Sequence, residues 1–243
     1  MVRTRVEYAD EQITVYRTPC PYACLYCWAW RIPLFSSRVQ RGKYDPVEEA
    51  KKLARRKKPL KIVVSFTSDP YPPQEAMLRK TRKVLEVLKD SRHTVMILTK
   101  NPILVHKLDL DFILDHRERF VVGTTVISTA KTYLEPRAPP PEERMEALKL
   151  FHNAGVRTWL SIEPIIPGVT DVGEIVKKTI KYVDYYVLGA YNYHKQLRKQ
   201  TGIVLTDEEL REFYREEIPS VTFILEQAGK EYLIKEELRK LLL

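Results

Sequence analysis

The chain has 243 residues, enough for one domain with a sizeable core, and its formal net charge is +9. It contains no run of 18 apolar residues and no signal-peptide core near the first residues, so we expect a cytoplasmic protein without a membrane partner. Residues 201–243 carry six Lys and Arg against ten Asp and Glu, a charge of −4, which leaves +13 on residues 1–200. This basic body favours nucleic acid as a partner, although a solvated, charge-rich surface explains the charge equally well. The abundance of Lys, Arg and Glu and the presence of only three Asn indicate a thermophilic source.

Apolar runs and helical patterns alternate along residues 13–188. The runs predict buried strands at 13–16, 62–66, 94–99, 120–127, 158–162 and 185–188. The helical patterns between them lie at 46–57, 74–89, 103–116, 141–154 and 172–182. This alternation predicts an α/β fold with a parallel sheet, and it fits a barrel and a doubly wound open sheet equally well.

The last 43 residues, 201–243, are predicted to form a mainly helical C-terminal extension packed on a domain of residues 1–200. Thr206 and Glu209 have the spacing of a capping box at the start of a helix. Pro219 and Gly229 are expected to interrupt the extension. Residues 232–243 are predicted to add a short strand and a last helix.

The three cysteines, Cys20, Cys24 and Cys27, lie within eight positions, and the chain has no others. A structural disulfide framework is therefore excluded, and the three thiols are most simply explained as soft-metal ligands, which iron–sulfur clusters favour. Two alternatives stay open. Zinc would need a fourth ligand, such as a histidine, and Cys24 with Cys27 would suit a thioredoxin-like redox pair.

The spacing Cys-x3-Cys-x2-Cys, with Tyr26 before the last cysteine, resembles the signature of the radical SAM superfamily. The resemblance implies a [4Fe-4S] cluster on the three cysteines, with a fourth iron left open for S-adenosylmethionine. It implies a partial (β/α)6 TIM-type barrel for residues 1–200, which include an N-terminal lead-in. It also implies reductive cleavage of S-adenosylmethionine to a 5′-deoxyadenosyl radical, which abstracts hydrogen from a substrate. The electron would come from an external donor of the ferredoxin or flavodoxin type.

Polar residues follow each predicted strand, at the carboxyl ends where ligands gather in parallel sheets. Four segments resemble, in order, the spore photoproduct lyase branch of the superfamily: Thr-Ser-Asp-Pro-Tyr, Leu-Thr-Lys-Asn-Pro, Leu-Glu-Pro-Arg-Ala-Pro and Pro-Ile-Ile-Pro-Gly. By this resemblance Ser68 and Asp69 receive the methionine amino group, and Lys100 meets the carboxylate. The other implied contacts are Ser128 (ribose or methionine), Glu135 and Arg137 (near the carboxylate), and Tyr26, Ile165 and Gly189 (adenine pocket). The alternative for Asp69, Lys100 and Arg137 is an ordinary turn or solvated loop position.

Tyr191 and Tyr193 follow the last predicted strand, in the cluster Tyr-Asn-Tyr-His. Spore photoproduct lyase uses a further cysteine as hydrogen-atom donor, and this chain has none left, so repair of spore photoproduct is not expected. Tyr191 and Tyr193 are the candidate catalytic residues, with regenerated 5′-deoxyadenosine as another hydrogen donor and a packed aromatic patch as the structural alternative. The family branch and the charge suggest a nucleobase in DNA or RNA as substrate. A small molecule or peptide is the alternative substrate, and a nucleic-acid-binding protein with a structural metal is the alternative function.

Overall fold

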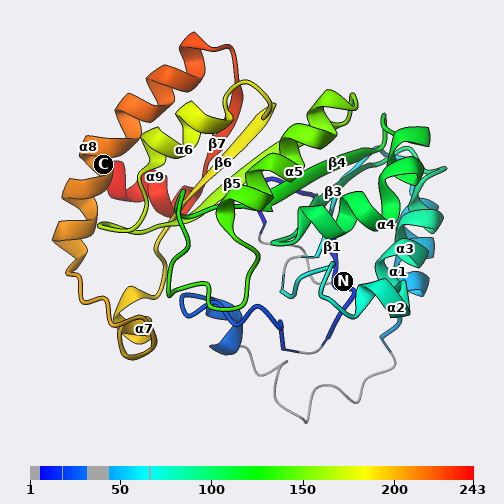
Figure 1. Ribbon diagram of the computed structural model, residues 1–243, viewed down its shortest axis with the longest axis horizontal. Helices are drawn as coiled ribbons and strands as arrows, with labels where there is room; N and C mark the ends of the chain where they lie inside the picture. The colour runs from blue at the N-terminus through cyan, green and yellow to red at the C-terminus, as the bar shows by residue number, and fades with distance from the viewer. Residues whose placement is uncertain (1–5, 18, 32–43, 66) are drawn as a thin grey trace.

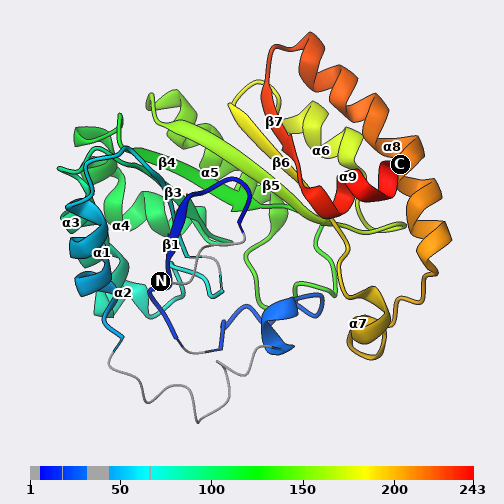
Figure 2. The same cartoon turned by 180° about the vertical axis from the view of Figure 1, so that it is seen from behind.

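The structure is a computed structural model that describes residues 6–17, 19–31, 44–65 and 67–243. Seven strands form one sheet in the order β1 to β7, and every neighbouring pair is parallel. The sheet curls into a half-barrel, and most helices cover its outer face (Figures 1 and 2). The predicted α/β partial barrel is confirmed, and the C-terminal segment adds β7 as a seventh strand.

The elements agree with the predicted alternation, with shifts at their ends. The strands are β1 Glu11–Ile13, β2 Lys61–Val64, β3 Thr94–Leu98, β4 Phe120–Thr125, β5 Arg157–Ile165, β6 Tyr185–Ala190 and β7 Glu231–Ile234. The helices are η1 Trp28–Arg31, α1 Pro46–Ala54, α2 Glu75–Leu78, α3 Lys80–Leu88, α4 Pro102–Asp115, α5 Pro141–Asn153, α6 Val172–Thr179, α7 His194–Thr201, α8 Asp207–Gln227 and α9 Glu236–Leu242. The first strand ends at Ile13, where the sequence pattern predicted its start.

Two local expectations were wrong, and one helix was missed. The helix predicted at 74–89 is broken in two at Arg79, whose φ of 49° ends α2 and whose guanidinium contacts Asp109 Oδ1 at 2.6 Å. Pro219 does not interrupt its helix, because α8 runs through it. Helix α7 was not predicted, and it begins directly after Tyr193.

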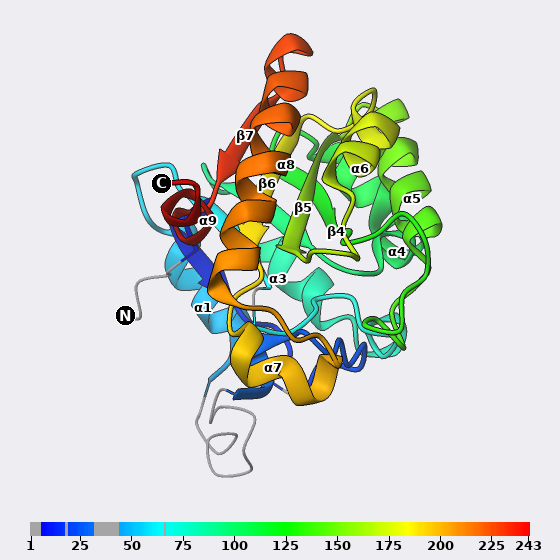
Figure 3. The same ribbon diagram turned by 90° about the vertical axis from the view of Figure 1, so that its left-hand side faces the viewer.

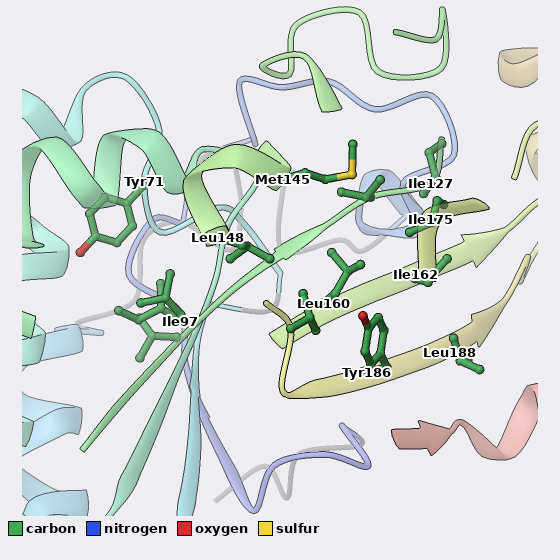
Figure 4. Packing of buried hydrophobic residues seen from close by; sticks show 14 of the residues in the cluster. Tyr71, Ile97, Ile127, Met145, Leu148, Leu160, Ile162, Ile175, Tyr186 and Leu188 are labelled. Atoms are coloured by element: carbon green, nitrogen blue, oxygen red, sulfur yellow. The ribbon is translucent and has the colours of Figure 1, made fainter. Parts of the chain in front are cut away.

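The core has two layers. The larger one lies between the sheet and the helices and includes Ile97, Leu160 and Tyr186 (Figure 4). The smaller one fills the concave face, where Trp159 packs with inward side chains of β2, β3, β4 and β6. Tyr8, from the N-terminal segment, lies with its ring centroid 5.1 Å from that of Trp159 and covers the amino end of the sheet. A ligand is therefore expected at the carboxyl ends of the strands.

The C-terminal segment is tied to the rest of the chain at several points. The predicted capping box at the start of α8 is present between Thr206 and Glu209. The predicted last strand and helix are β7 and α9, and Glu7 accepts the Glu236 N–H at 2.8 Å. Within the described ranges, every helix is too short or too polar to span a bilayer.

Candidate metal and cofactor site

A cavity at the carboxyl ends of β2, β3 and β4 is the candidate site. The residues that line it are Cys20, Ala23, Cys24, Tyr26, Cys27, Ser65, Thr67, Ser68, Asp69, Leu98, Thr99, Lys100 and Thr125. In Figures 1 and 3 the cysteine segment, the loop after β4 and helix α7 lie together at this edge of the sheet. Three thiols, one carboxylate and one lysine therefore share a single cavity.

The donor set fits an iron–sulfur cluster better than either alternative. A thioredoxin-like pair would use only Cys24 and Cys27 and would leave Cys20 in the same cavity without a role, whereas a cluster uses all three thiols. Among the described residues, no three His, Cys, Asp or Glu side chains are placed to hold a single metal ion, as zinc would require. A [4Fe-4S] cluster needs no such convergence, because each thiolate binds a different iron atom.

Asp69 lies on the wall of this cavity and is buried. Its Oδ1 accepts hydrogen bonds from the Tyr71 N–H at 2.8 Å and the Thr99 hydroxyl at 2.6 Å, and its Oδ2 accepts from the Lys100 N–H at 2.7 Å. Burial raises the pKa of Asp69, and these hydrogen bonds oppose that shift. Because three donors fix its orientation, the carboxylate is pre-positioned to receive a cationic group through its remaining acceptor capacity.

Glu135 joins the cysteine loop to two cations. Its carboxylate accepts from the Tyr26 hydroxyl, from Lys100 Nζ at 2.6 Å and from the Arg144 guanidinium. Burial alone would raise the pKa of Glu135, but Lys100 and Arg144 outweigh it and hold the pKa at about 2. Lys100 Nζ also lies 5.4 Å from the Tyr26 ring centroid. Glu135 therefore places a positive charge beside the cysteine loop.

The other predicted residues lie outside the set that lines the cavity. Ser128 is half-buried and its hydroxyl accepts the Ala130 N–H at 3.3 Å, whereas Arg137 is exposed. Ile165 is buried, and its carbonyl accepts from the Tyr214 hydroxyl at 2.9 Å. Gly189 lies in β6, where an added Cβ would be 2.6 Å from Glu163 Cγ.

The two tyrosines differ in their surroundings. Tyr191 is buried in the core, and its hydroxyl lies 3.1 Å from the Thr201 hydroxyl. Tyr193 is 51% exposed and precedes α7 with a φ of 62°. The position of Tyr191 favours the packed aromatic patch, and the catalytic role of both residues stays a prediction.

Arg144 was not predicted by the sequence. It lies in α5 and is 1% exposed, and its NH1 donates to the Thr125 carbonyl at 2.6 Å. The carboxyl-end rule does not select Arg144 because it belongs to a helix. The helical pattern did contain a signal, since Arg144 lies three and four positions before the buried Ala147 and Leu148, on the same helix face.

Comparison with known proteins fixes the family. The sequence profile of the Radical SAM superfamily matches residues 18–183. The chain belongs to the radical SAM superfamily. Membership implies a [4Fe-4S] cluster and S-adenosylmethionine as cofactors, and radical SAM proteins generally need a reductant.

Two curated relatives of this radical SAM chain are described as uncharacterized proteins. One, from Methanocaldococcus jannaschii, is 31% identical over 172 residues, which cover 69% of this chain and 65% of the relative. The other, from Acidianus two-tailed virus, is 28% identical over 194 residues, which cover 73% of this chain and 63% of the relative. The chain thus spans slightly less than two thirds of the length of each relative.

Solved radical SAM structures share the fold. A point mutant of spore photoproduct lyase matches with a TM-score of 0.70 at 14% identity, covering 96% of this chain and 77% of that one. A double mutant of the same enzyme, with bound AdoMet and dinucleoside spore photoproduct, matches with a TM-score of 0.65 at 14% identity. The match covers 94% of this chain and 77% of the mutant enzyme. SuiB of Streptococcus suis, bound to S-adenosylmethionine, matches with a TM-score of 0.64 at 13% identity, and the match covers 93% of this chain and 50% of SuiB.

Proposed function

We propose that this chain is a radical SAM enzyme that binds a [4Fe-4S] cluster through Cys20, Cys24 and Cys27 and binds S-adenosylmethionine beside Asp69 and Lys100. The observation that carries the proposal is that all five side chains line one cavity at the carboxyl edge of the half-barrel. When bound, the cluster and S-adenosylmethionine supply reductive C–S cleavage and removal of a hydrogen atom from the substrate. A donor of the ferredoxin or flavodoxin type supplies the electron.

The protein's own side chains bind and orient the zwitterionic methionine group. Asp69 and Ser68 accept its ammonium, and Lys100 donates to its carboxylate, since paired charges at a buried site give strong hydrogen bonds. Glu135 positions Lys100, because the 2.6 Å ion pair holds the lysine beside Tyr26. Arg144 anchors Glu135 from the opposite side.

The remaining proposed contacts surround this central group. Ser128 meets the ribose or the methionine, Arg137 adds a charge near the carboxylate, and Ile165 and Gly189 line the adenine pocket. Tyr191 and Tyr193 stay the proposed residues for hydrogen return, with regenerated 5′-deoxyadenosine as the alternative donor, because no cysteine lies outside the cluster motif. These assignments rest on the family resemblance.

Two measurements on one preparation test the enzyme. The anaerobically reconstituted protein should contain about four irons and four sulfides per chain. With dithionite and S-adenosylmethionine it should release 5′-deoxyadenosine and methionine, and Cys24→Ala should abolish both the cluster and the cleavage. A protein that binds one zinc and never releases 5′-deoxyadenosine would instead be the binding protein with a structural metal.

We propose a nucleobase in DNA or RNA as the substrate. A groove beside the end of β1 supports this, because its lining includes four cations, Arg17, Lys51, Lys80 and Lys83, against Asp45 and Glu48. Arg17, which lines the groove, lies three residues before Cys20 in the sequence. A nucleic-acid strand whose phosphates bind in the groove would therefore pass close to the cluster. An unstacked base could then reach the carboxyl edge of the barrel.

A salt titration tests the nucleic-acid substrate. Binding to tRNA, duplex DNA and single-stranded DNA should weaken steeply with salt, because each neutralised phosphate releases counterions. The double variant Lys80→Ala, Lys83→Ala should reduce the log–log salt slope by about 1 to 2. Lys177→Ala with Lys181→Ala, two exposed positions at and just beyond the end of α6, is the matched control and should leave the slope unchanged. Absence of binding at low salt would remove nucleic acid as the substrate.

A further inference from the structure

A second polar site lies on the concave face of the half-barrel, near β5, β6 and β7. Along β5, Leu160 and Ile162 pack toward the helices, whereas Trp159 belongs to the inner layer. By strand alternation Glu163 points to the same inner side as Trp159. Lys235 directly follows β7, and its N–H donates to the Leu188 carbonyl at 3.0 Å, which places it beside β6.

Glu163 and Lys235 form an ion pair across β6. Lys235 Nζ lies 2.6 Å from Glu163 Oε1, and the two side chains are 7% and 21% exposed, respectively. Gly189 makes the pair possible, because a Cβ on this residue would lie 2.6 Å from Glu163 Cγ. The glycine thus lets the glutamate lie flat across the strand that separates it from the lysine.

The pair keeps unused hydrogen-bonding capacity. Glu163 Oε2 accepts no hydrogen bond from the described residues, and Glu163 is the only described side chain that Lys235 Nζ contacts by a hydrogen bond. The Tyr8 hydroxyl is also buried without a hydrogen-bond partner among the described residues. The Tyr8 ring packs against Trp159, with ring centroids 5.1 Å apart, and so lies on the same concave face as Glu163. Acceptor and donor groups therefore share this partly buried face.

Stability alone does not explain this arrangement. Removing two charges from water is costly, and a buried ion pair is often no more stable than an apolar pair of similar volume. The Tyr8 hydroxyl, buried without a partner among the described residues, adds a further cost unless a ligand or water satisfies it. We therefore favour a ligand-binding role for the Glu163–Lys235 pair.

We propose that Glu163 and Lys235 form a substrate-binding pair that recognises a neutral amide edge, with Glu163 accepting its N–H and Lys235 donating to its adjacent C=O. The pair has no net charge, so Glu163 would repel a phosphate or carboxylate that approached Lys235. Nucleobase lactams and peptide-type amides both present such an edge. The inference rests on the proposed function, because it takes the cluster and the methionine group to occupy the cavity at β2 to β4 and the adenine to lie against the backbone of Ile165 and Gly189. The Glu163–Lys235 pair is then left for the substrate.

The test measures ligand binding to the reconstituted holoprotein with S-adenosylmethionine, without reductant. The probes are uridine and N-methylacetamide. Uridine is compared with 3-methyluridine, and N-methylacetamide with N,N-dimethylacetamide, because each of these N-methylated analogues lacks the N–H. Wild type should bind at least one N–H probe at least tenfold more tightly than its analogue, and the probe that binds identifies the source of the edge. Glu163→Gln should abolish that preference, and Lys235→Met should weaken binding of the N–H probe at least tenfold.

Controls separate binding from folding and from the cofactor. Glu163→Gln is isosteric and keeps an acceptor for Lys235, but it leaves the lysine charge unpaired and should lower the unfolding temperature. Binding is therefore measured well below the unfolding midpoint of each variant. Arg239→Met removes another ion pair that ties the C-terminal segment to the rest of the chain, at 3.4 Å from Glu7, and should leave probe affinity unchanged.

Four results would overturn the proposal: no probe binding to wild type, no preference for the N–H probes, unchanged affinity in both variants, or weaker S-adenosylmethionine binding in Glu163→Gln. The last would make Glu163 an adenine contact. Failure of the proposed function would show separately, as absence of 5′-deoxyadenosine from reduced wild type.

Discussion

At the scale of single residues, Lys100 is held by Glu135 and is the residue that we propose to bind the methionine carboxylate. It donates to Glu135 at 2.6 Å, and we assign its remaining donors to the methionine carboxylate. Lys100→Ala should leave iron content and visible absorption unchanged, because the thiols are untouched. It should weaken S-adenosylmethionine binding by about 1.5 to 3 kcal/mol, the range for a lost hydrogen bond to a charged group. Equilibrium dialysis against labelled S-adenosylmethionine measures this, and wild-type affinity in the variant would remove Lys100 from the site.

Arg144 and Arg137 form a matched pair of arginines for a second test. Arg144→Met removes one cation from the buried Glu135 carboxylate and should lower the free energy of unfolding by about 3 to 5 kcal/mol. Arg137→Met, on the exposed loop, should change it by less than about 0.5 kcal/mol. Urea unfolding measures both. The same Arg137 variant tests its predicted contact with S-adenosylmethionine, and equal loss of stability in the two variants would contradict the role given to Arg144.

At the scale of elements, the close approach of β4 and β5 depends on a glycine. A Cβ on Gly123 would lie 2.2 Å from Trp159 Nε1, and this buried indole donates to the Ile97 carbonyl at 3.1 Å. Gly123→Ala should displace the indole, break that bond and lower the free energy of unfolding by about 2 to 4 kcal/mol. Gly173→Ala in α6 is the control. Its Cβ would meet nothing closer than 3.6 Å, so stability should stay the same or rise by up to about 1 kcal/mol. Equal effects would show that crowding at Trp159 is not the cause.

Sequence periodicity predicts most elements here because buried strands and amphipathic helices differ in their apolar patterns. Six strands and the helices between them follow from that signal. It misses the break at Arg79, since the left-handed residue lies within a continuous helical pattern and its guanidinium is held by Asp109, which is distant in the chain. It also misses α7, a short polar helix. Local sequence carries no record of such tertiary contacts.

The candidate site shows the same limit. The cysteines and the strand-end residues Asp69 and Lys100 follow from spacing and from the carboxyl-end rule. The sequence does not reveal that Glu135, rather than solvent, pairs with Lys100, or that Arg144 and not Arg137 completes this group. These partners come from a loop and a helix whose positions depend on the whole fold.

At the scale of the whole molecule, the two terminal segments hold each other. The Glu7 carboxylate accepts the Glu236 N–H at 2.8 Å and contacts Arg239 at 3.4 Å, so it caps α9 from the far end of the chain. Glu7→Ala should lower the free energy of unfolding by about 1 kcal/mol, the usual cost of a lost helix cap. Glu212→Ala, exposed on α8, should have no measurable effect. Urea unfolding of both variants measures this difference. An unchanged free energy of unfolding in Glu7→Ala would mean that α9 needs no such cap.

The order of the strands has a consequence for synthesis on the ribosome. Each of the strands β2 to β7 pairs with the strand that precedes it in the chain, so an emerging strand can join a sheet that has already begun to form. The contacts of Glu163 with Lys235 and of Glu7 with Glu236 must wait until residues 235 and 236 have left the exit tunnel. A nascent chain stalled before residue 231 would therefore carry the cysteine loop on a half-barrel whose last strand is missing. The concave face beside β6 is completed only after residues 231–235 have emerged.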